Sequence, residues 1–550
     1  MNDIQENLRK YIKDATLRVY GNEDYVKDIL VEIPRDTKIA DYSTNIAMKL
    51  AKELKQNPFD IATKIVEELK KEDFGVEKIE IARPGFINFT MRKDTLANCI
   101  NYIVDHKETY GHNNIGNGLR ILVEYVSANP TGDLHLGHAR GAAWGDAITR
   151  LLNVSGYDCL REFYINDAGH QIDMLGESLL SRYFDIFGEK YPLPEEGYHA
   201  QDIIDIAKII ANKDGNKWLN ADPKERLEYF KDEGIELELA KIERDLKYFR
   251  CEFDSWVHER FFYLDNNKRI EEVLDKMKSM NLTYEKDGAL WFKTTDYGDD
   301  KDRVLKKKDG SLTYMTPDIA NHVYKLERGY TKLVDLWGAD HHGYVARMCA
   351  ALEALGYPKK TLEVDLEQMV RLVEDGKEVK MSKRTGNAIS LRELCEDVGI
   401  DAARYIFVSH EVGAHLDFDL AVARKKNADN PVFYAQYAFA RMSSILRDAP
   451  KFVKSEKYDL LVNQRETDLL KTLNEFPSIV GDAAKTRMPN KICNYIQKLA
   501  TYFHSYYGTC KINDLDNKEL TNERVGLVTA TAITLKNALD LIGVEAPEKM

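Results

Sequence analysis

The segment from residue 119 to residue 146 limits the fold of this chain more than any other. An apolar run at 119–126 is followed by the turn-forming sequence Asn-Pro-Thr-Gly and then by a stretch rich in small residues. The run predicts a short buried strand, and the stretch after the turn predicts a helix. Three glycines spaced four residues apart would share one face of that helix and let it lie close on a sheet: Gly137, Gly141 and Gly145. A strand, a turn and a helix in this order predict an α/β domain with a parallel sheet.

Two histidines stand at the start of the expected helix, in the sequence His135-Leu136-Gly137-His138. The preceding strand and turn would place them at the carboxyl edge of the sheet, where α/β folds bind ligands and a helix N-terminus favours anions. The imidazoles could donate hydrogen bonds to a triphosphate, or they could merely cap the helix. No third ligand is in view, so a metal site is not predicted. The chain has neither a P-loop nor a GxGxxG sequence, so this sheet would hold phosphates in another way.

A second candidate is the basic sequence Lys380-Met381-Ser382-Lys383-Arg384. A basic loop of this kind suits a polyphosphate whose negative charge increases in the transition state. Taken alone, most such sequences are solvated loops.

Three regions differ in their patterns. Residues 1–112 mix helical periodicity, as at 59–69, with short strands, as at 86–89. Residues 113–400 read as the α/β domain, with a second strand at 331–338 and a charged, mostly helical insertion at about 170–300. Residues 401–550 have almost no strand signal and predict a helical bundle, in which a helix begins near Asn430-Pro431. Apolar residues at helical spacing predict its core: Ile492, Tyr495, Ile496, Leu499, Phe503, Val528, Ala532, Leu535, Leu539 and Ile542.

Composition narrows the class of protein. The 550 residues are 44% hydrophobic and 31% charged, which is typical of a soluble globular chain. No apolar run approaches the ~18 residues that span a bilayer, and charges near the N-terminus argue against a signal peptide. Seven cysteines without a CxxC pair indicate reduced thiols and a cytoplasmic location. The net charge of −13 argues weakly against a broad nucleic-acid-binding surface but allows local basic stripes.

The histidine-containing sequence at 135–138 and the basic sequence at 380–384 together resemble the HxGH and KMSKS signatures of class I aminoacyl-tRNA synthetases. Within that class, several segments resemble the arginyl-tRNA synthetases: 123–132, 162–169, 314–320 and 337–344. The likeness continues in Pro84–Asn88, in Asn430–Ala438 and in the C-terminal ten residues. It implies a Rossmann-like catalytic domain, an α+β N-terminal domain that contacts tRNA, and an all-α anticodon-binding domain.

The resemblance also implies the chemistry. Members of this family use ATP to convert L-arginine to arginyl-adenylate, release pyrophosphate, and transfer arginine to the 3′ end of tRNA-Arg. His135, His138, Lys380 and Lys383 would be catalytic, and Mg²⁺ would arrive on the phosphates. The implied ATP contacts are His135, Gly137, His138, Gly338, Asp340, Lys380 and Lys383.

The other substrates have implied positions too. Arginine presents a planar cation, which suits a carboxylate beside an aromatic ring. The matching residues are Glu124, Asn129, Tyr314 and Asp318. The implied tRNA contacts are Phe86, Asn88, Tyr434, Tyr437 and Met550, although both tyrosines also fit a bundle core. The resemblance further implies a monomer that binds neither membrane nor DNA.

Two departures and three alternatives remain at this point. Asp133 stands where proline is common in the family, and Gly132 stands where some members that lack the KMSK lysines carry a lysine.

A nucleotidylyltransferase of the same superfamily would share the HxGH sequence, but the helical C-terminal region disfavours it. An inactive synthetase-like RNA-binding or regulatory protein would have little reason to keep both signatures with Tyr314 and Asp318. A class I synthetase for another amino acid is disfavoured by the acidic site expected at Asp318.

Overall fold

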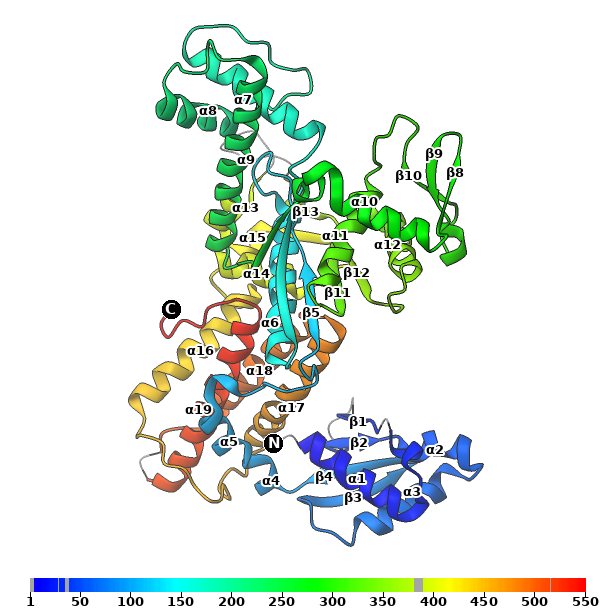
Figure 1. Ribbon diagram of the computed structural model, residues 1–550. Coiled ribbons are helices and arrows are strands. Elements are labelled where there is room, and N and C mark those ends of the chain that lie inside the picture. The colour runs from blue at the N-terminus through cyan, green and yellow to red at the C-terminus, as the bar shows by residue number, and fades with distance from the viewer. Residues whose placement is uncertain (1–3, 28, 35–38, 380–388, 515) are drawn as a thin grey trace.

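A parallel sheet lies at the centre of the protein, with two domains at one end and two inserted subdomains at the other (Figure 1). The computed structural model describes residues 4–27, 29–34, 39–379, 389–514 and 516–550. Among these residues no helix is long and apolar enough to cross a membrane. All seven cysteines are free thiols, as the sequence predicts, and five of them are buried.

The central sheet has five strands in the order β12-β11-β5-β6-β7, and all four neighbouring pairs are parallel. The strands predicted at 119–126 and 331–338 are confirmed as β5 and β11, which are neighbours in register, with Glu124 opposite Asp335. Because helices cover a parallel sheet, β5 has no exposed face: Leu122 and Val123 are both fully buried. The strand bounds are β5 (Arg120–Glu124), β6 (Asp158–Ile165), β7 (Ser255–His258), β11 (Lys332–Gly338) and β12 (Leu362–Glu367).

Helix α6 (Leu136–Val154) lies against this sheet as closely as its glycines allow. A Cβ atom added at Gly145 would come 2.3 Å from the ring of Tyr125, and one at Gly141 would come 2.7 Å from Glu367 Oε2. Both distances are far below van der Waals contact. The glycine face predicted from the spacing is therefore confirmed as a contact surface. Two further helices cross between strands: α11 (Met315–Glu327) and α12 (His342–Ala354).

The segment expected to form one helical insertion is divided by β7, which belongs to the central sheet. Its first part is a helical subdomain with a small core of its own, at the upper left of Figure 1: α7 (His170–Ile186), α8 (Gln201–Asp214) and α9 (Pro223–Tyr248). Its second part contains α10 (Leu264–Ser279) and an antiparallel sheet: β8 (Thr283–Lys286), β9 (Ala289–Phe292) and β10 (Arg303–Lys306). The four residues of β7 are too few to give a periodic signal, so the sequence did not reveal this division.

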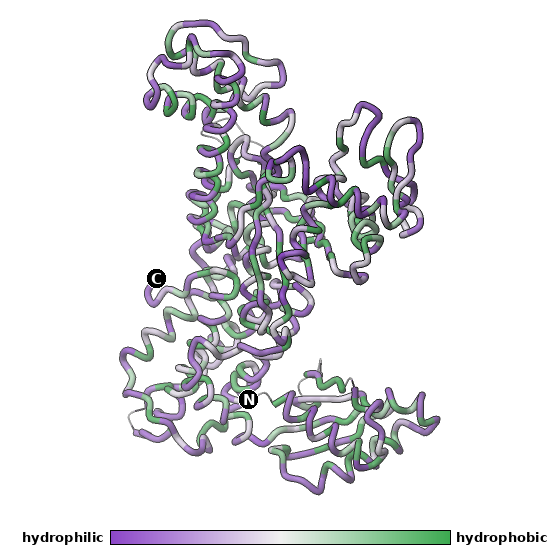
Figure 2. The backbone as a smooth tube through the Cα atoms, viewed as in Figure 1, coloured by the Kyte–Doolittle hydropathy of each residue, from purple (hydrophilic) through white to green (hydrophobic). Residues whose placement is uncertain are grey.

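The C-terminal region is the expected helical bundle, formed by α16 (Pro431–Asp448), α17 (Gln464–Thr486), α18 (Asn490–Thr509) and α19 (Lys518–Leu541). All ten predicted core residues are buried. The predicted helix start is confirmed, since Asn430 Oδ1 caps α16 by accepting from the Val432 amide. Figure 2 shows hydrophobic and hydrophilic stretches alternating along these helices, as amphipathic packing requires.

The region 401–550 contains one strand that the sequence analysis did not predict. Strand β15 (Leu416–Asp419) pairs in parallel with β13 (Val370–Glu374), which also pairs with β14 (Lys377–Glu378). Helices α14 (Ile400–Ser409) and α15 (Leu420–Ala423) pack against this small sheet, and α13 (Leu391–Val398) packs on α14.

The N-terminal domain is a four-stranded antiparallel sheet with helices: α1 (Ile4–Tyr20), β1 (Val31–Glu32), β2 (Tyr42–Thr44), α2 (Ile46–Leu54), α3 (Pro58–Leu69), β3 (Val76–Ala82) and β4 (Phe86–Met91). The helix predicted at 59–69 and the strand predicted at 86–89 are confirmed as α3 and β4.

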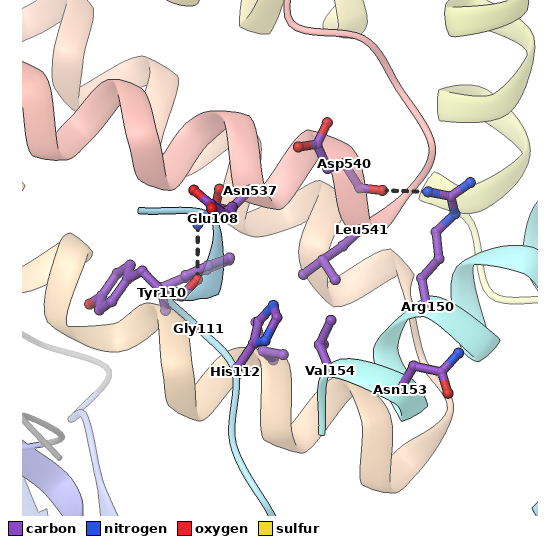
Figure 3. Close-up of a pocket in the computed structure, with 12 residues that line it drawn as sticks. Glu108, Tyr110, Gly111, His112, Arg150, Asn153, Val154, Asn537, Asp540 and Leu541 are labelled. Atoms are coloured by element: carbon purple, nitrogen blue, oxygen red, sulfur yellow. Dashed lines mark hydrogen bonds between the residues drawn. The ribbon is translucent and has the colours of Figure 1, made fainter. Parts of the chain in front are cut away.

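Residues 93–110, here called the linker, pack on the C-terminal bundle. They include α4 (Lys93–Ala97) and α5 (Cys99–His106). Asn474 Nδ2 donates to the Leu96 carbonyl at 3.0 Å, and Asn537 Nδ2 donates to the Tyr110 carbonyl at 3.0 Å. A pocket of about 290 Å³ lies where this linker meets α6 and α19 (Figure 3). The linker therefore joins all three domains.

Candidate active site

The two histidines of the HLGH sequence cap helix α6 with each other's help. His135 is the N-cap, and its Nδ1 accepts from the Gly137 amide at 3.1 Å and from the His138 amide at 3.4 Å. His138 Nδ1 in turn accepts from the His135 amide at 3.3 Å. The two rings stack with centroids 3.7 Å apart. This is a capping box built from two imidazoles.

The caps also fix the protonation of both rings. A ring nitrogen that accepts a hydrogen bond carries no proton, so each neutral imidazole holds its proton on Nε2. Burial lowers the pKa of His135, and burial together with the neighbouring His135 lowers the pKa of His138 to about 3. Both rings are therefore neutral at pH 7, with the Nε2–H groups as their only donors. Capping the helix and binding an anion, the two roles considered for these histidines, are compatible. The same residues cap the helix through Nδ1 and can bind an anion through Nε2.

Lys380 and Lys383 of the second signature lie outside the described residues, but both flanks of that segment are placed. On its N-terminal side the Val379 amide donates to the Leu372 carbonyl at 2.9 Å. On its C-terminal side Ser390 forms a β-bridge with His135, and the Leu391 amide donates to the Leu134 carbonyl at 2.7 Å. The chain that follows the second signature is thus hydrogen-bonded to the first one.

A cavity of about 230 Å³ opens at the carboxyl ends of β5 and β11. Its lining residues come from β5 and the loop after it, β6, α11, β11, the 3-10 turn Ala339–His341 and α12: Glu124, Val126, Ser127, Tyr164, Asp318, Asn321, His322, Leu336, Trp337, Gly338, His341 and Tyr344. Three of the predicted site residues, Glu124, Asp318 and Gly338, are brought together here. Asp340 lies just beyond, with its side chain 82% exposed.

Asp318 is the acidic group of the cavity that has only a neutral side-chain partner. Tyr344 donates its hydroxyl to Asp318 Oδ2 at 2.6 Å. Burial raises the pKa of Asp318, while the hydrogen bond from Tyr344 opposes that rise. A half-buried carboxylate without a cationic partner is destabilising unless a cation is supplied. A cationic ligand in this cavity would supply one.

A chain of buried charges lies behind the cavity and reaches its lining through Glu124 and His322. Lys325 Nζ lies 2.5 Å from Glu124 Oε2 and 3.3 Å from Asp335 Oδ1. His322 joins the chain through Nε2, 2.8 Å from Asp335 Oδ2, and through Nδ1, 2.7 Å from the Asp318 carbonyl. Burial alone would raise the pKa of Asp335, but Lys325 and His322 outweigh burial and lower it. Glu124 is thus engaged by Lys325, and the network fixes the α11 turn that carries Asp318.

Replacing Lys325 with methionine should destabilise the protein by about 3–5 kcal/mol, because two buried carboxylates would lose their shared cation. Chemical denaturation followed by circular dichroism measures this change. Lys208→Met is the control, since both side chains of its pair with Asp205 are exposed and its loss should leave the midpoint nearly unchanged. A Lys325→Met midpoint equal to that of the wild type would contradict the structural role of the network.

Two predicted arginine contacts do not line the cavity. Tyr314 is the residue before α11, and 89% of its surface is exposed. Asn129 donates from Nδ2 to Gln171 Oε1 at 2.7 Å. Both remain predictions. The aromatic residue that contacts Asp318 in the structure is Tyr344, which sequence reasoning did not assign although it ends the segment Trp337–Tyr344 that carries the family resemblance.

Other residues of the cavity also escaped the sequence reading. The hydroxyl of Tyr164 and the Oδ1 of Asn321 are buried without a hydrogen-bond partner among the described residues. Both line the cavity, so each offers a ligand a polar contact. Tyr164 lies within the segment 162–169 and Asn321 lies directly after the segment 314–320, both of which carry the family resemblance. No periodic signal marks a residue as facing a cavity.

The predicted tRNA contacts lie far from this cavity, in the N- and C-terminal domains. Asn88 on β4 is buried and accepts from Ser43 Oγ at 2.7 Å, while Phe86 is half-buried. On α16, Tyr434 is half-buried against His504, with ring centroids 4.7 Å apart. Tyr437 is 43% exposed and Met550 is 54% exposed. Tyr437 therefore presents part of its ring to solvent, which a pure core role would not require.

Comparison with known proteins matches every domain. Three family models cover the chain: "Arginyl tRNA synthetase N terminal domain" over residues 2–91, "tRNA synthetases class I (R), catalytic domain" over 99–413, and "DALR anticodon binding domain" over 435–550. An arginine–tRNA ligase of Bacillus subtilis is 48% identical over 552 residues, which are 100% of this chain and 99% of that protein. The arginine–tRNA ligase of Oceanobacillus iheyensis is also 48% identical, over the full length of both chains.

Solved structures agree. A putative arginyl-tRNA synthetase from Campylobacter jejuni has a TM-score of 0.76 and 36% identity, covering 84% of this chain and 100% of its own. The fold also matches the arginyl-tRNA synthetase of Thermus thermophilus, with a TM-score of 0.76 at 23% identity over 99% of this chain and 100% of that one.

Proposed function

The chain belongs to the class I arginyl-tRNA synthetase family, and from that premise we propose how its residues act as an arginine–tRNA ligase. The observation that carries the proposal is the cavity at the carboxyl edge of the sheet, which contains the half-buried carboxylate of Asp318. The loop after β5, which supplies Val126 and Ser127 to its lining, continues to the capping box of His135 and His138. The reaction joins the arginine carboxylate to the α-phosphate of ATP and releases pyrophosphate. Arginine then passes to the 3′ end of tRNA-Arg. The alternative of an inactive relative is not favoured.

Arginine would bind with its guanidinium at Asp318, where a planar cation with fixed donors would meet a half-buried carboxylate. Tyr344 holds that carboxylate in place by its hydrogen bond. Asn129 would contact the α-amino or carboxylate end of the amino acid, and Glu124 would act through Lys325. Tyr314 is exposed at the cavity's helix, and we propose that it covers bound arginine.

ATP would bind with its phosphates at the Nε2–H groups of His135 and His138. These donors are neutral and fixed before the substrate arrives, so no proton must be lost or reoriented during the reaction. Gly137 belongs to the same helix N-terminus. Gly338 and Asp340 would hold the ribose at the end of β11. Lys380 and Lys383 would stabilise the charge that develops on leaving pyrophosphate.

Mg²⁺ would enter as the ATP complex, where it neutralises phosphate charge. Within the described ranges no three His, Cys, Asp or Glu side chains are grouped as a metal site. Phosphate oxygens would therefore supply the principal ligands in this proposal.

The tRNA would lie along the N- and C-terminal domains. Phe86 and Asn88 offer stacking and hydrogen bonding to an unpaired base, and the partly exposed Tyr437 with Tyr434 and Met550 offers contacts for the anticodon. We also propose that the protein works as a monomer in the cytoplasm.

The test is charging of total tRNA with labelled arginine, ATP and Mg²⁺, with lysine, glutamine and cysteine assayed in parallel. Acid-precipitable label with arginine alone is expected. Label with another amino acid would refute arginine specificity, and no label with the homologous tRNA would favour the inactive relative.

A further inference from the structure

Asp133, which stands next to the HLGH sequence where proline is common in the family, has a specific partner in this structure. Its Oδ1 lies 2.9 Å from the Nζ of Lys241 on α9. The same Nζ lies 2.9 Å from Asp202 Oδ2 on α8 and 3.2 Å from Glu238 Oε2. One ammonium group thus joins the loop after β5 to two helices of the helical subdomain.

The loop after β5 is held from both sides. On the subdomain side, the Asn129–Gln171 hydrogen bond to α7 adds to the Asp133–Lys241 pair. On the opposite side, the Leu391 amide donates to the Leu134 carbonyl. His135 follows directly after these anchored positions. The placement of its ring therefore depends on groups from α7, α9 and α13.

Lys241 is better placed to hold this loop than an ordinary surface lysine. Its side chain is 16% exposed, whereas those of Asp202 and Glu238 are 11% and 0% exposed. Burial by itself would lower the pKa of Lys241, but the three carboxylates outweigh burial and raise it. Asp133 is the outermost of the three, with 56% of its side chain exposed. Without Lys241 its charge would face the phosphate-binding loop uncompensated.

We propose that Lys241 is a positioning residue for ATP: it neutralises Asp133 and anchors the loop that carries His135, so that the helical subdomain sets the geometry of the phosphate-binding imidazoles. This inference rests on the proposed function of His135 and His138. Lys241 touches no substrate and acts through Asp133. In this proposal the helical subdomain contributes to the geometry of the ATP site.

Steady-state kinetics of pyrophosphate exchange tests the inference. Lys241→Met should raise the KM for ATP about fivefold, with the KM for arginine unchanged and kcat within about twofold, because a partly buried ion pair of this kind has modest strength. Lys241→Arg should restore the wild-type KM. Lys208→Met is the matched control, since Lys208 on α8 pairs with Asp205 at the surface.

A double-variant cycle distinguishes positioning through Asp133 from a general loss of structure. If Lys241 acts through Asp133, the Lys241→Met effect on the KM for ATP should be much smaller in an Asp133→Asn background. Equal effects in both backgrounds would overturn the proposal.

Hydrogen exchange of the ligand-free protein gives a readout that does not depend on activity. Amides of residues 126–139 should exchange faster in Lys241→Met than in the wild type or in Lys208→Met. Unchanged exchange would overturn the anchoring role even in an active enzyme. Faster exchange in a protein whose wild type activates no amino acid would support the anchoring and would refute the proposed function instead.

Discussion

Replacing His138 with alanine is expected to slow arginine-dependent exchange of pyrophosphate into ATP by about 10²–10³-fold, the usual cost of losing one preorganised donor to a developing charge. The ring offers only its Nε2–H, because Nδ1 is occupied by the His135 amide. The loss should therefore fall on kcat more than on the KM for arginine. Exchange of labelled pyrophosphate at saturating arginine measures it.

An asparagine at position 138 separates the two tasks of this residue. The Oδ1 of asparagine takes the place of Nδ1 and can accept from the His135 amide, whereas its side chain ends one bond short of Nε2. His138→Asn should fold like the wild type and still be slow. His199→Ala, at an exposed position of the helical subdomain, is the control and should keep full activity. Activity within threefold of the wild type in His138→Ala would contradict the role of the imidazole.

Changing Asp318 to asparagine is expected to raise the KM for arginine about 100-fold, because the guanidinium would lose a charge-assisted hydrogen bond in a partly buried site. The effect on the KM for ATP should be small, since Asp318 lies on α11 and the histidines lie at the start of α6. Asparagine preserves the size of the side chain and one acceptor oxygen. The rise in the KM for arginine would therefore measure the contribution of the carboxylate's charge and not of its shape.

Citrulline provides the matched ligand for this variant. It has the shape of arginine without the charge, so the wild type should bind arginine far more tightly, and Asp318→Asn should lose most of that preference. Competition of citrulline with arginine in the exchange assay measures it. Glu327→Gln, an exposed change at the far end of the same helix, should alter neither constant. A preference for arginine that survives in Asp318→Asn would place the guanidinium site elsewhere.

The local parts of this protein could be predicted from its sequence. The run at 119–126, the turn after it and the glycines at intervals of four predicted a strand and a closely packed helix, and the structure has both. The buried positions of α18 and α19 followed from helical periodicity. The two signatures and the segments between them identified the family, which the comparisons support. Each of these signals is a short pattern formed by residues close together in the sequence.

Contacts between distant segments were decided only by the tertiary structure. The four residues of β15 alternate apolar and acidic side chains, but four residues are too few to predict a strand, and β13 supplies the hydrogen bonds that make them one. Residues 93–110 precede the catalytic domain in the sequence but pack on the C-terminal bundle. The sequence gives no partner for the charge of Asp133, which pairs with Lys241 in the structure. Likewise, nothing in the sequence joins Glu124 to Lys325, or Asp318 to Tyr344. Periodicity records which face of an element is buried, whereas the partner that meets that face is chosen by the packing of the whole chain.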